Sequence, residues 1–188
     1  MPRPAATLVL ARPARAGIEV LVLRRSNRSR FLPGFVVFPG GVIEPGDDAL
    51  AAELLGDPAE AARACAVREL AEEAGLRLTD DGVQRGRSPA AVSIERLAEI
   101  ARWIAPEFLE TRFDARFFAA TALPGVDPEP DGSEIDAAWW DRPEEILAWD
   151  ESRMWPTEVT LRALAGCASP AGVLSLRIEQ TPNPEAPR

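Results

Sequence analysis

The chain of 188 residues contains no histidine, no lysine and no tyrosine, so all 21 of its positively charged side chains are arginines. These absences exclude histidine bases and ligands, Ser-His catalytic triads, lysine Schiff bases and the lysine of a Walker-type phosphate loop. Any catalysis by this chain must therefore use carboxylates, arginine, water and bound metal.

Cysteines and long apolar runs are also scarce. The two cysteines, Cys65 and Cys167, are not spaced as a metal-binding motif, and small-residue packing is the expected role of Cys65. No apolar run approaches the roughly eighteen residues that cross a membrane. Residues 1–7 do not resemble a signal peptide. We therefore expect a cytoplasmic protein that makes no membrane contact.

The net charge of −9 and the isoelectric point near 4.7 argue against a broad nucleic-acid-binding surface. An acidic protein that binds a polyanion needs local arginine clusters and bound cations. Residues 24–30 contain four arginines at the end of an expected strand, where guanidinium groups could bind phosphates. A solvated loop is the alternative interpretation.

The most informative stretch is residues 68–76, Arg-Glu-Leu-Ala-Glu-Glu-Ala-Gly-Leu. On an α-helix, Glu69, Glu72 and Glu73 project from one face within a single turn. Like charges at this spacing cost roughly 0.2–0.5 kcal/mol per pair, a cost that a divalent cation with several oxygen ligands removes. Gly75 suits the left-handed residue that ends such a helix. The alternative is an acidic face exposed to water.

Two neighbouring features favour a metal site. Phe38-Pro39-Gly40-Gly41 precedes the helix, and paired glycines let the backbone approach a ligand or metal closely. Arg68 lies beside the acids and could hold one carboxylate through a bidentate bond.

Together these residues resemble the Nudix box, Gly-x5-Glu-x7-Arg-Glu-apolar-x-Glu-Glu-x-Gly-apolar. Residues 68–76 match every defined position of its second half. In the first half, Gly41 is followed after five residues by an acid, Asp47. Twenty residues rather than seven then precede Arg68, so thirteen extra residues interrupt the box.

The Nudix resemblance implies hydrolysis of a diphosphate linked to another group, with Mg²⁺ or Mn²⁺ as the cofactor and a small molecule as the substrate. It implies an α/β (α+β) fold, an α/β/α sandwich around a mixed β-sheet, and we expect residues 1–188 to form one such domain. The site residues that it implies are Glu69, Glu72, Glu73 and Gly41 at the metal, Glu72, Glu73, Arg68 and Glu134 in catalysis, and Arg25, Arg30 and Gly40 at the substrate.

The spacing Arg25-Ser-x3-Arg30-x3-Gly34-x3-Phe38-Pro39-Gly40-Gly41 is similar to the signature of Nudix enzymes that split coenzyme A. Leu23 replaces the threonine of that signature. The peroxisomal branch of these enzymes also carries an insertion in its box, so coenzyme A or an acyl-coenzyme A is the expected substrate. The alternatives are another nucleoside diphosphate derivative, such as NADH or an ADP-sugar, or a non-catalytic ligand-binding module. A non-catalytic module normally has a damaged box, and this one is intact.

The insertion, residues 48–60, begins with a short amphipathic pattern that Gly56 ends. Asp57 is the expected cap of the next helix, and Glu60 is expected to close a capping box. Glu60 would face away from Glu69, so we expect a structural role for it. The insertion could shape the pocket or supply a contact in a homodimer.

Glu134 precedes an expected strand and could bring a fourth acid to the cluster, although a strand-edge glutamate facing water is equally compatible with its position. The tryptophans are expected in the core, with Trp103 or Trp140 as alternatives for stacking on adenine. We expect strands at 5–10, 18–25, 35–38, 111–120 and 134–140, helices at 48–55, 94–104, 144–149 and 157–165, and a mobile tail at 181–188. A partly extended segment is the alternative for residues 94–104.

Overall fold

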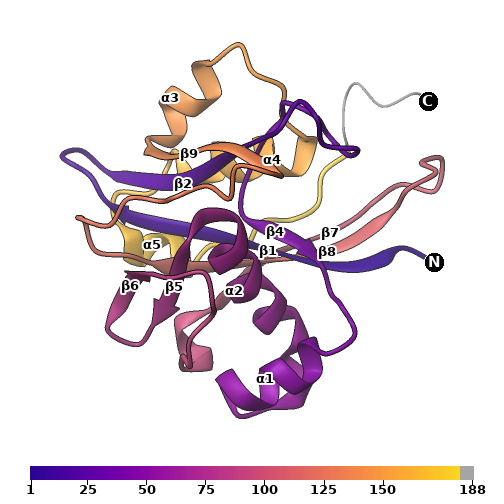
Figure 1. Ribbon diagram of the computed structural model, residues 1–188. Helices are drawn as coiled ribbons and strands as arrows, with labels where there is room; N and C mark the ends of the chain where they lie inside the picture. The colour runs from indigo at the N-terminus through magenta and orange to yellow at the C-terminus, as the bar shows by residue number, and fades with distance from the viewer. Residues whose placement is uncertain (183–188) are drawn as a thin grey trace.

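The computed structural model describes residues 1–182 and centres on a seven-stranded mixed β-sheet (Figure 1). Strand β1 is its central strand. The parallel partner β8 lies on one side of β1, and the antiparallel partners β2 and β4 share the other side. Strands β3 and β9 pair with β2, and β7 pairs with β8 at the opposite edge. The strands are β1 (Arg3–Pro13), β2 (Ile18–Arg25), β3 (Val36–Val37), β4 (Gly40–Val42), β7 (Ala98–Ile104), β8 (Phe113–Thr121) and β9 (Ile135–Asp141).

Helices cover both faces of the sheet. In Figure 1, α1 (Asp47–Leu55) and α2 (Ala61–Ala74) lie below it and α3 (Pro143–Ala148) lies above it. Helices α4 (Trp155–Leu164) and α5 (Pro170–Leu174) pack on the same face as α3. A separate hairpin, β5 (Leu76–Thr79) and β6 (Gly82–Arg85), follows α2. The predicted α/β/α sandwich is confirmed.

The two cores follow from the alternation of side chains along a strand. In β1, Leu8 and Leu10 are buried against α2, whereas Val9 and Ala11 are buried against α4 and α5. Such a strand is apolar along its whole length because both of its faces are covered.

The helix predicted at residues 94–104 is wrong. Residues Ile94–Arg96 form one 3-10 turn, and β7 follows it. An irregularity in the pairing with β8 lies between Glu99 and Ala101, and Ile100 and Ala101 are both buried. This bulge interrupts the two-residue period, so the apolar spacing resembles that of a helix.

The helix expected at 48–55 is confirmed by α1, which ends at Gly56 with φ 76°. Asp57 accepts a hydrogen bond from the Ala59 N–H, as expected for a cap, but it begins a 3-10 turn, Pro58–Glu60. Glu60 does not close a capping box; its carboxylate pairs with Arg63.

Most of the predicted tail, 181–188, lies outside the described residues, and the described Thr181 carbonyl accepts a bond from Trp155 Nε1. No helix within residues 1–182 has the length and apolarity that crossing a membrane requires.

Candidate active site

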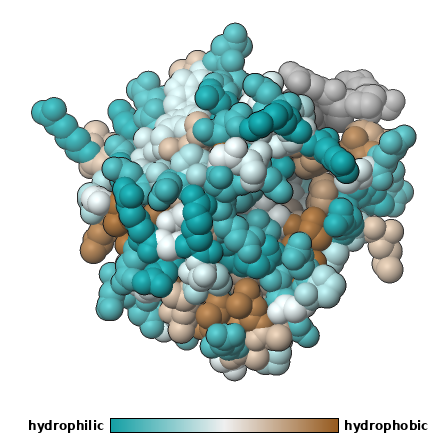
Figure 2. All heavy atoms as spheres, viewed as in Figure 1, coloured by the Kyte–Doolittle hydropathy of each residue, from teal (hydrophilic) through white to brown (hydrophobic). Residues whose placement is uncertain are grey.

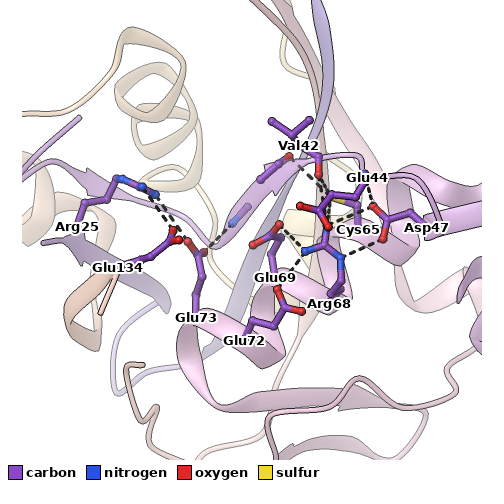
Figure 3. A network of polar contacts seen from close by, with 12 residues as sticks. Arg25, Val42, Glu44, Asp47, Cys65, Arg68, Glu69, Glu72, Glu73 and Glu134 are labelled. Carbon is purple, nitrogen blue, oxygen red and sulfur yellow. Dashed lines mark hydrogen bonds and ion pairs between the residues drawn. The ribbon is translucent and has the colours of Figure 1, made fainter. Parts of the chain in front are cut away.

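Helix α2 presents the three glutamates as the sequence predicts (Figure 3). Val67, Leu70 and Ala74 are buried in the core on the other side of the helix. Gly75 ends the helix with φ 62°, and its N–H bonds to the Ala71 and Leu70 carbonyls. The side chains of Glu69 and Glu73 are 13% and 7% exposed, whereas Glu72 is half-exposed. The acids are therefore not a solvated face, because two of the three are largely removed from water.

Strand β4 approaches α2 closely because it begins with two glycines. A Cβ on Gly41 would overlap the Glu69 carboxylate, and a Cβ on Gly40 would lie 2.6 Å from the Ala6 carbonyl oxygen. The Gly40 N–H donates to Glu73 Oε2 at 3.0 Å. Gly41 is therefore required for the close approach of β4 to α2, and Gly40 for its close approach to β1.

Arg68 joins the two halves of the interrupted motif. Its Nε and Nη2 donate to the two oxygens of Asp47 at 3.0 and 3.2 Å, and its Nη1 donates to Glu69 at 2.7 Å and to Glu72 at 3.0 Å. Asp47 is buried and also accepts a bond from the Glu44 N–H. Arg68 therefore pairs with Asp47, the acid of the first half of the motif, although the inserted residues separate the two halves in the sequence.

Arg25 and Glu134 lie on the other side of Glu73 (Figure 3). Arg25 Nη1 is 3.7 Å from Glu73 Oε1, and its Nη2 is 3.8 Å from Glu134 Oε2. Glu134 comes to this position because β9 pairs with β2, whose end carries Arg25. The Glu134 side chain remains 69% exposed. The structure thus brings the predicted fourth acid to the cluster.

The turn that presents Glu134 is organised by Asp131, which the sequence analysis did not single out. Its carboxylate accepts hydrogen bonds from the N–H groups of Ser133, Glu134 and Ile135. Burial acts to raise the pKa of Asp131, but a hydrogen bond from the Ser133 hydroxyl and these backbone bonds outweigh it and lower the pKa. The Asp-Gly-Ser sequence at 131–133 is a typical turn signal that could have indicated it.

Positive charge only partly balances the carboxylates. Burial raises the pKa of Glu73 to about 8, and the negative charge of Glu69 acts in the same direction; the Gly40 N–H and Arg25 oppose them. Burial also raises the pKa of Glu69, against the influence of Arg68. Clustered, desolvated carboxylate oxygens beside an accessible glycine backbone are the donor set that hard divalent cations prefer, so these residues fit such an ion.

The carboxylates of the cluster do not surround a single metal position. Within residues 1–182, no group of three or more cysteine or acidic side chains is arranged to surround a metal ion. Arg68 holds Glu69 and Glu72, while Glu73 turns toward Gly40 and Arg25. The metal-binding roles therefore remain predictions.

The acids open into a cleft of about 1160 Å³. Arg30, Gly40 and Trp103 line it, whereas Trp140 donates through Nε1 to the Val126 carbonyl outside it. Residues 48–56 of the insertion do not line this cleft; Leu54 and Leu55 pack against the core instead. The insertion therefore does not shape the pocket directly.

Two nearby groups have structural roles. Glu60 pairs with Arg63, away from the acid cluster, as expected. Cys65 is fully buried, and burial raises the pKa of its thiol to about 12, while Arg68 acts to lower it. A thiol with such a pKa is not a nucleophile at neutral pH.

A family model for the NUDIX domain matches residues 55–160, more than half of the chain. The chain belongs to the NUDIX family. A NUDIX hydrolase from Alicyclobacillus acidocaldarius has a crystal structure that is 31% identical, with a TM-score of 0.80 over 95% of this chain and 98% of that one. The matched range begins at the last residue of α1 and includes the whole helix that carries Arg68 and the glutamates.

Other relatives of this NUDIX chain are more distant or match in part. The crystal structure of a MutT NUDIX hydrolase from Burkholderia pseudomallei is 18% identical, with a TM-score of 0.56 over 86% of this chain and 97% of that one, and shows the shared fold. A Caenorhabditis elegans protein named "Putative nudix hydrolase 7" is 39% identical over 82 residues, which is 44% of this chain. The match spans about a quarter (24%) of that protein's length.

NUDIX membership, with relatives named as hydrolases, indicates a hydrolase that acts on phosphorus anhydrides. Members of the family generally use divalent metal ions, which agrees with the carboxylate cluster of α2. The non-catalytic alternative is therefore not favoured.

Proposed function

We propose that this protein hydrolyses the diphosphate linkage of coenzyme A or an acyl-coenzyme A in the presence of Mg²⁺ or Mn²⁺. The observation that carries the proposal is the meeting of the α2 carboxylates with Arg25 at one end of a large cleft. This combination offers metal ligands and a phosphate-binding cation side by side.

In this proposal Glu69, Glu72 and Glu73, with the Gly41 backbone, hold the metal. A bound Mg²⁺ would neutralise charge on the diphosphate and lower the pKa of a bound water. Arg68 positions Glu69 and Glu72 through the hydrogen bonds described above.

In this proposal Arg25 contacts a phosphate oxygen, because it lines the cleft directly beside Glu73. The water oxygen forms a bond to phosphorus, the P–O bond to the bridging oxygen breaks, and the leaving phosphate takes the electron pair. Glu73 or Glu134 takes the proton of the attacking water. A Glu134→Gln exchange distinguishes them: a large loss of kcat with unchanged metal affinity would assign the proton transfer to Glu134.

The preference for coenzyme A rests on a second positive group. Coenzyme A carries a 3′-phosphate in addition to its diphosphate, and Arg30 lines the same cleft as the acids. Within residues 1–182, Arg30 forms no ion pair with an acidic side chain, so its guanidinium group is available to a phosphate. The spacing from Arg25 to Gly41 that resembles the coenzyme A signature supports the same substrate.

The test is a product analysis with coenzyme A, dephospho-coenzyme A, NADH and ADP-ribose, each with Mg²⁺, with Mn²⁺ and with a chelator. We expect adenosine 3′,5′-bisphosphate and 4′-phosphopantetheine from coenzyme A. If no such products formed while NADH or ADP-ribose was cleaved efficiently, the substrate assignment would be wrong and only the reaction class would remain. The Glu73→Gln variant is the control for a contaminating hydrolase.

A further inference from the structure

The cleft extends from the acids across the sheet to its far edge. Val42 of β4, Ala5 of β1, Ala115 of β8 and Trp103 of β7 are partners in register and form one row across the four strands. Partners in register present their side chains on the same face, and four strands span about 14 Å. All four residues line the cleft. These four side chains share the face of Val9 and Ala11, opposite to α2, and the acids meet this face beside Gly41, the neighbour of Val42. Because Ala5 and Ala115 are small, they leave space on this face between Val42 and Trp103.

The cleft lining is charged at the acids of α2 and apolar along this row. Beyond the row, Phe31, Ile104, Phe108 and Leu109 also line the cleft and are 39–55% exposed. Phe31 also contacts Phe113 with ring centroids 5.4 Å apart. Large apolar side chains that gather at a cleft and remain exposed typically mark a binding site. The face of the molecule in Figure 2 is mostly polar, with apolar residues in separate patches.

Residues 178–182, which we call the C-terminal strap, lie beside the edge strand β7, and Gln180, Thr181 and Pro182 line the cleft. The Ile178 N–H donates to the Ile100 carbonyl at 2.7 Å, which attaches the strap to the edge strand β7. The Gln180 amide makes two further bonds, accepting from the Ile104 N–H and donating to the Ile104 carbonyl, both at 2.9 Å. Trp155 Nε1 donates to the Thr181 carbonyl at 3.0 Å and ties the strap to α4.

We propose that this apolar arm of the cleft binds an apolar organic group attached to the diphosphate, and that Gln180 sets the length of the group that fits. The inference rests on the proposed diphosphate hydrolysis. A diphosphate held at the acids directs one of its two organic groups along the row toward the strap. Gln180 is a positioning residue, since it acts by holding the strap against β7.

The experiment uses the full chain with Mg²⁺ and adenosine 5′-diphosphate esterified at its β-phosphate with methanol, hexanol or dodecanol. Only the apolar group changes, so differences in KM report the arm. Burial of a methylene contributes about 0.8 kcal/mol, so KM should be at least about tenfold lower for the hexyl than for the methyl ester, with kcat little changed. The dodecyl ester should gain nothing over the hexyl ester, because the strap blocks the longer chain.

Gln180→Ala removes both side-chain bonds to Ile104 and should loosen the strap between its remaining bonds at Ile178 and Thr181. We expect this variant to lower KM for the dodecyl ester, relative to KM for the methyl ester, at least about fivefold. Trp155→Phe, which loses the indole N–H that donates to Thr181 together with part of the ring, should act in the same direction. The control is Glu179→Gln, an exposed neighbour that does not line the cleft.

Each negative result identifies a different error. Equal KM values for the methyl and hexyl esters would overturn the apolar arm but leave diphosphate hydrolysis standing. An unchanged length dependence in a folded Gln180→Ala protein would overturn the role of the strap. Cleavage of coenzyme A but of none of the esters would also reject the arm, whereas cleavage of no diphosphate at all would reject the proposed function and the arm together.

Discussion

Arg25 and Arg30 occupy different surroundings although both lie in the same arginine-rich segment. Arg25 faces Glu73 and Glu134, whereas Arg30 lines the cleft without an acidic partner in the described chain. The sequence alone does not distinguish the surroundings of the two arginines, because the contact between Arg25 and Glu73 joins residues that lie 48 positions apart (73 − 25 = 48).

This difference predicts a split between two variants. Arg30→Ala should raise KM for coenzyme A about tenfold or more and change KM for dephospho-coenzyme A little, because only coenzyme A has a 3′-phosphate. Arg25→Ala should impair both compounds equally, since its side chain lies where the diphosphate is proposed to bind. Steady-state kinetics on both compounds measures the split. Equal losses in Arg30→Ala would assign that residue to the diphosphate or to structure.

The acids of α2 support a second prediction. Glu72→Gln and Glu73→Gln should abolish Mg²⁺-dependent turnover without lowering the melting temperature, because each removes a like charge from the cluster. In Glu73→Gln the amide oxygen can still accept the Gly40 N–H. Glu60→Gln is the matched control: it should stay active and lose about 1 kcal/mol of stability or less through its weakened contact with Arg63. An inactive but fully stable Glu60→Gln would show that the wrong acids have been assigned.

At the scale of the element, α2 was predictable and β7 was not. Helix α2 carries consistent signals, with apolar residues on one face, acids on the other and Gly75 at its end. The apolar pattern of β7 is distorted by the bulge between Glu99 and Ala101, and its identity as a strand depends on pairing with β8. In the same way, the glutamates could be predicted as a group, whereas the approach of Glu134 depends on the pairing of β9 with β2.

The pairing of β7 with β8 includes a titratable contact. Arg116 of β8 donates to both oxygens of Glu99 of β7 at 3.0 and 2.6 Å, and these bonds lower the pKa of Glu99, although partial burial opposes them. A lowered folded-state pKa contributes stability above the unfolded value, near 4.5, and this contribution disappears as the pH falls through the folded value.

Glu99→Gln should therefore destabilise the protein by about 0.2–1 kcal/mol at pH 7, since the pair is partly exposed. The difference from the unmodified protein should shrink below about pH 4.5 and vanish once Glu99 is protonated. Urea unfolding at pH 7, 5 and 3.5 measures it. A difference that stayed constant over this range would attribute the effect to packing rather than to charge.

The inserted helix α1 gives a further prediction. Replacing residues 49–56 by a short Gly-Ser linker, with Asp47 retained, should lower stability because Leu54 and Leu55 pack against the core. A variant that still folds should keep metal-dependent diphosphate cleavage, since these residues do not line the cleft. Calorimetry and turnover on coenzyme A measure the two effects separately. Loss of metal binding in a folded variant would show that the insertion helps to build the metal site.

At the scale of the whole molecule, folding brings negative charge together. The chain has a net charge of −9, and folding places Glu69 and Glu73 in surroundings that raise the pKa of each. A cation that binds these acids only in the folded state must stabilise the whole chain by mass action.

Saturation with Mg²⁺ at about a hundred times its Kd should therefore add about 2.7 kcal/mol of stability. For a chain of this size, such a gain corresponds to a rise in Tm of roughly 5–10 °C. Scanning calorimetry at increasing Mg²⁺, with Na⁺ at equal ionic strength as the control for screening, measures this rise. The rise should be smaller in Glu73→Gln and unchanged in Glu60→Gln, because only Glu73 belongs to the proposed metal site. Equal rises in all three proteins, or the same rise with Na⁺, would mean that the cation acts by general charge screening rather than at this site.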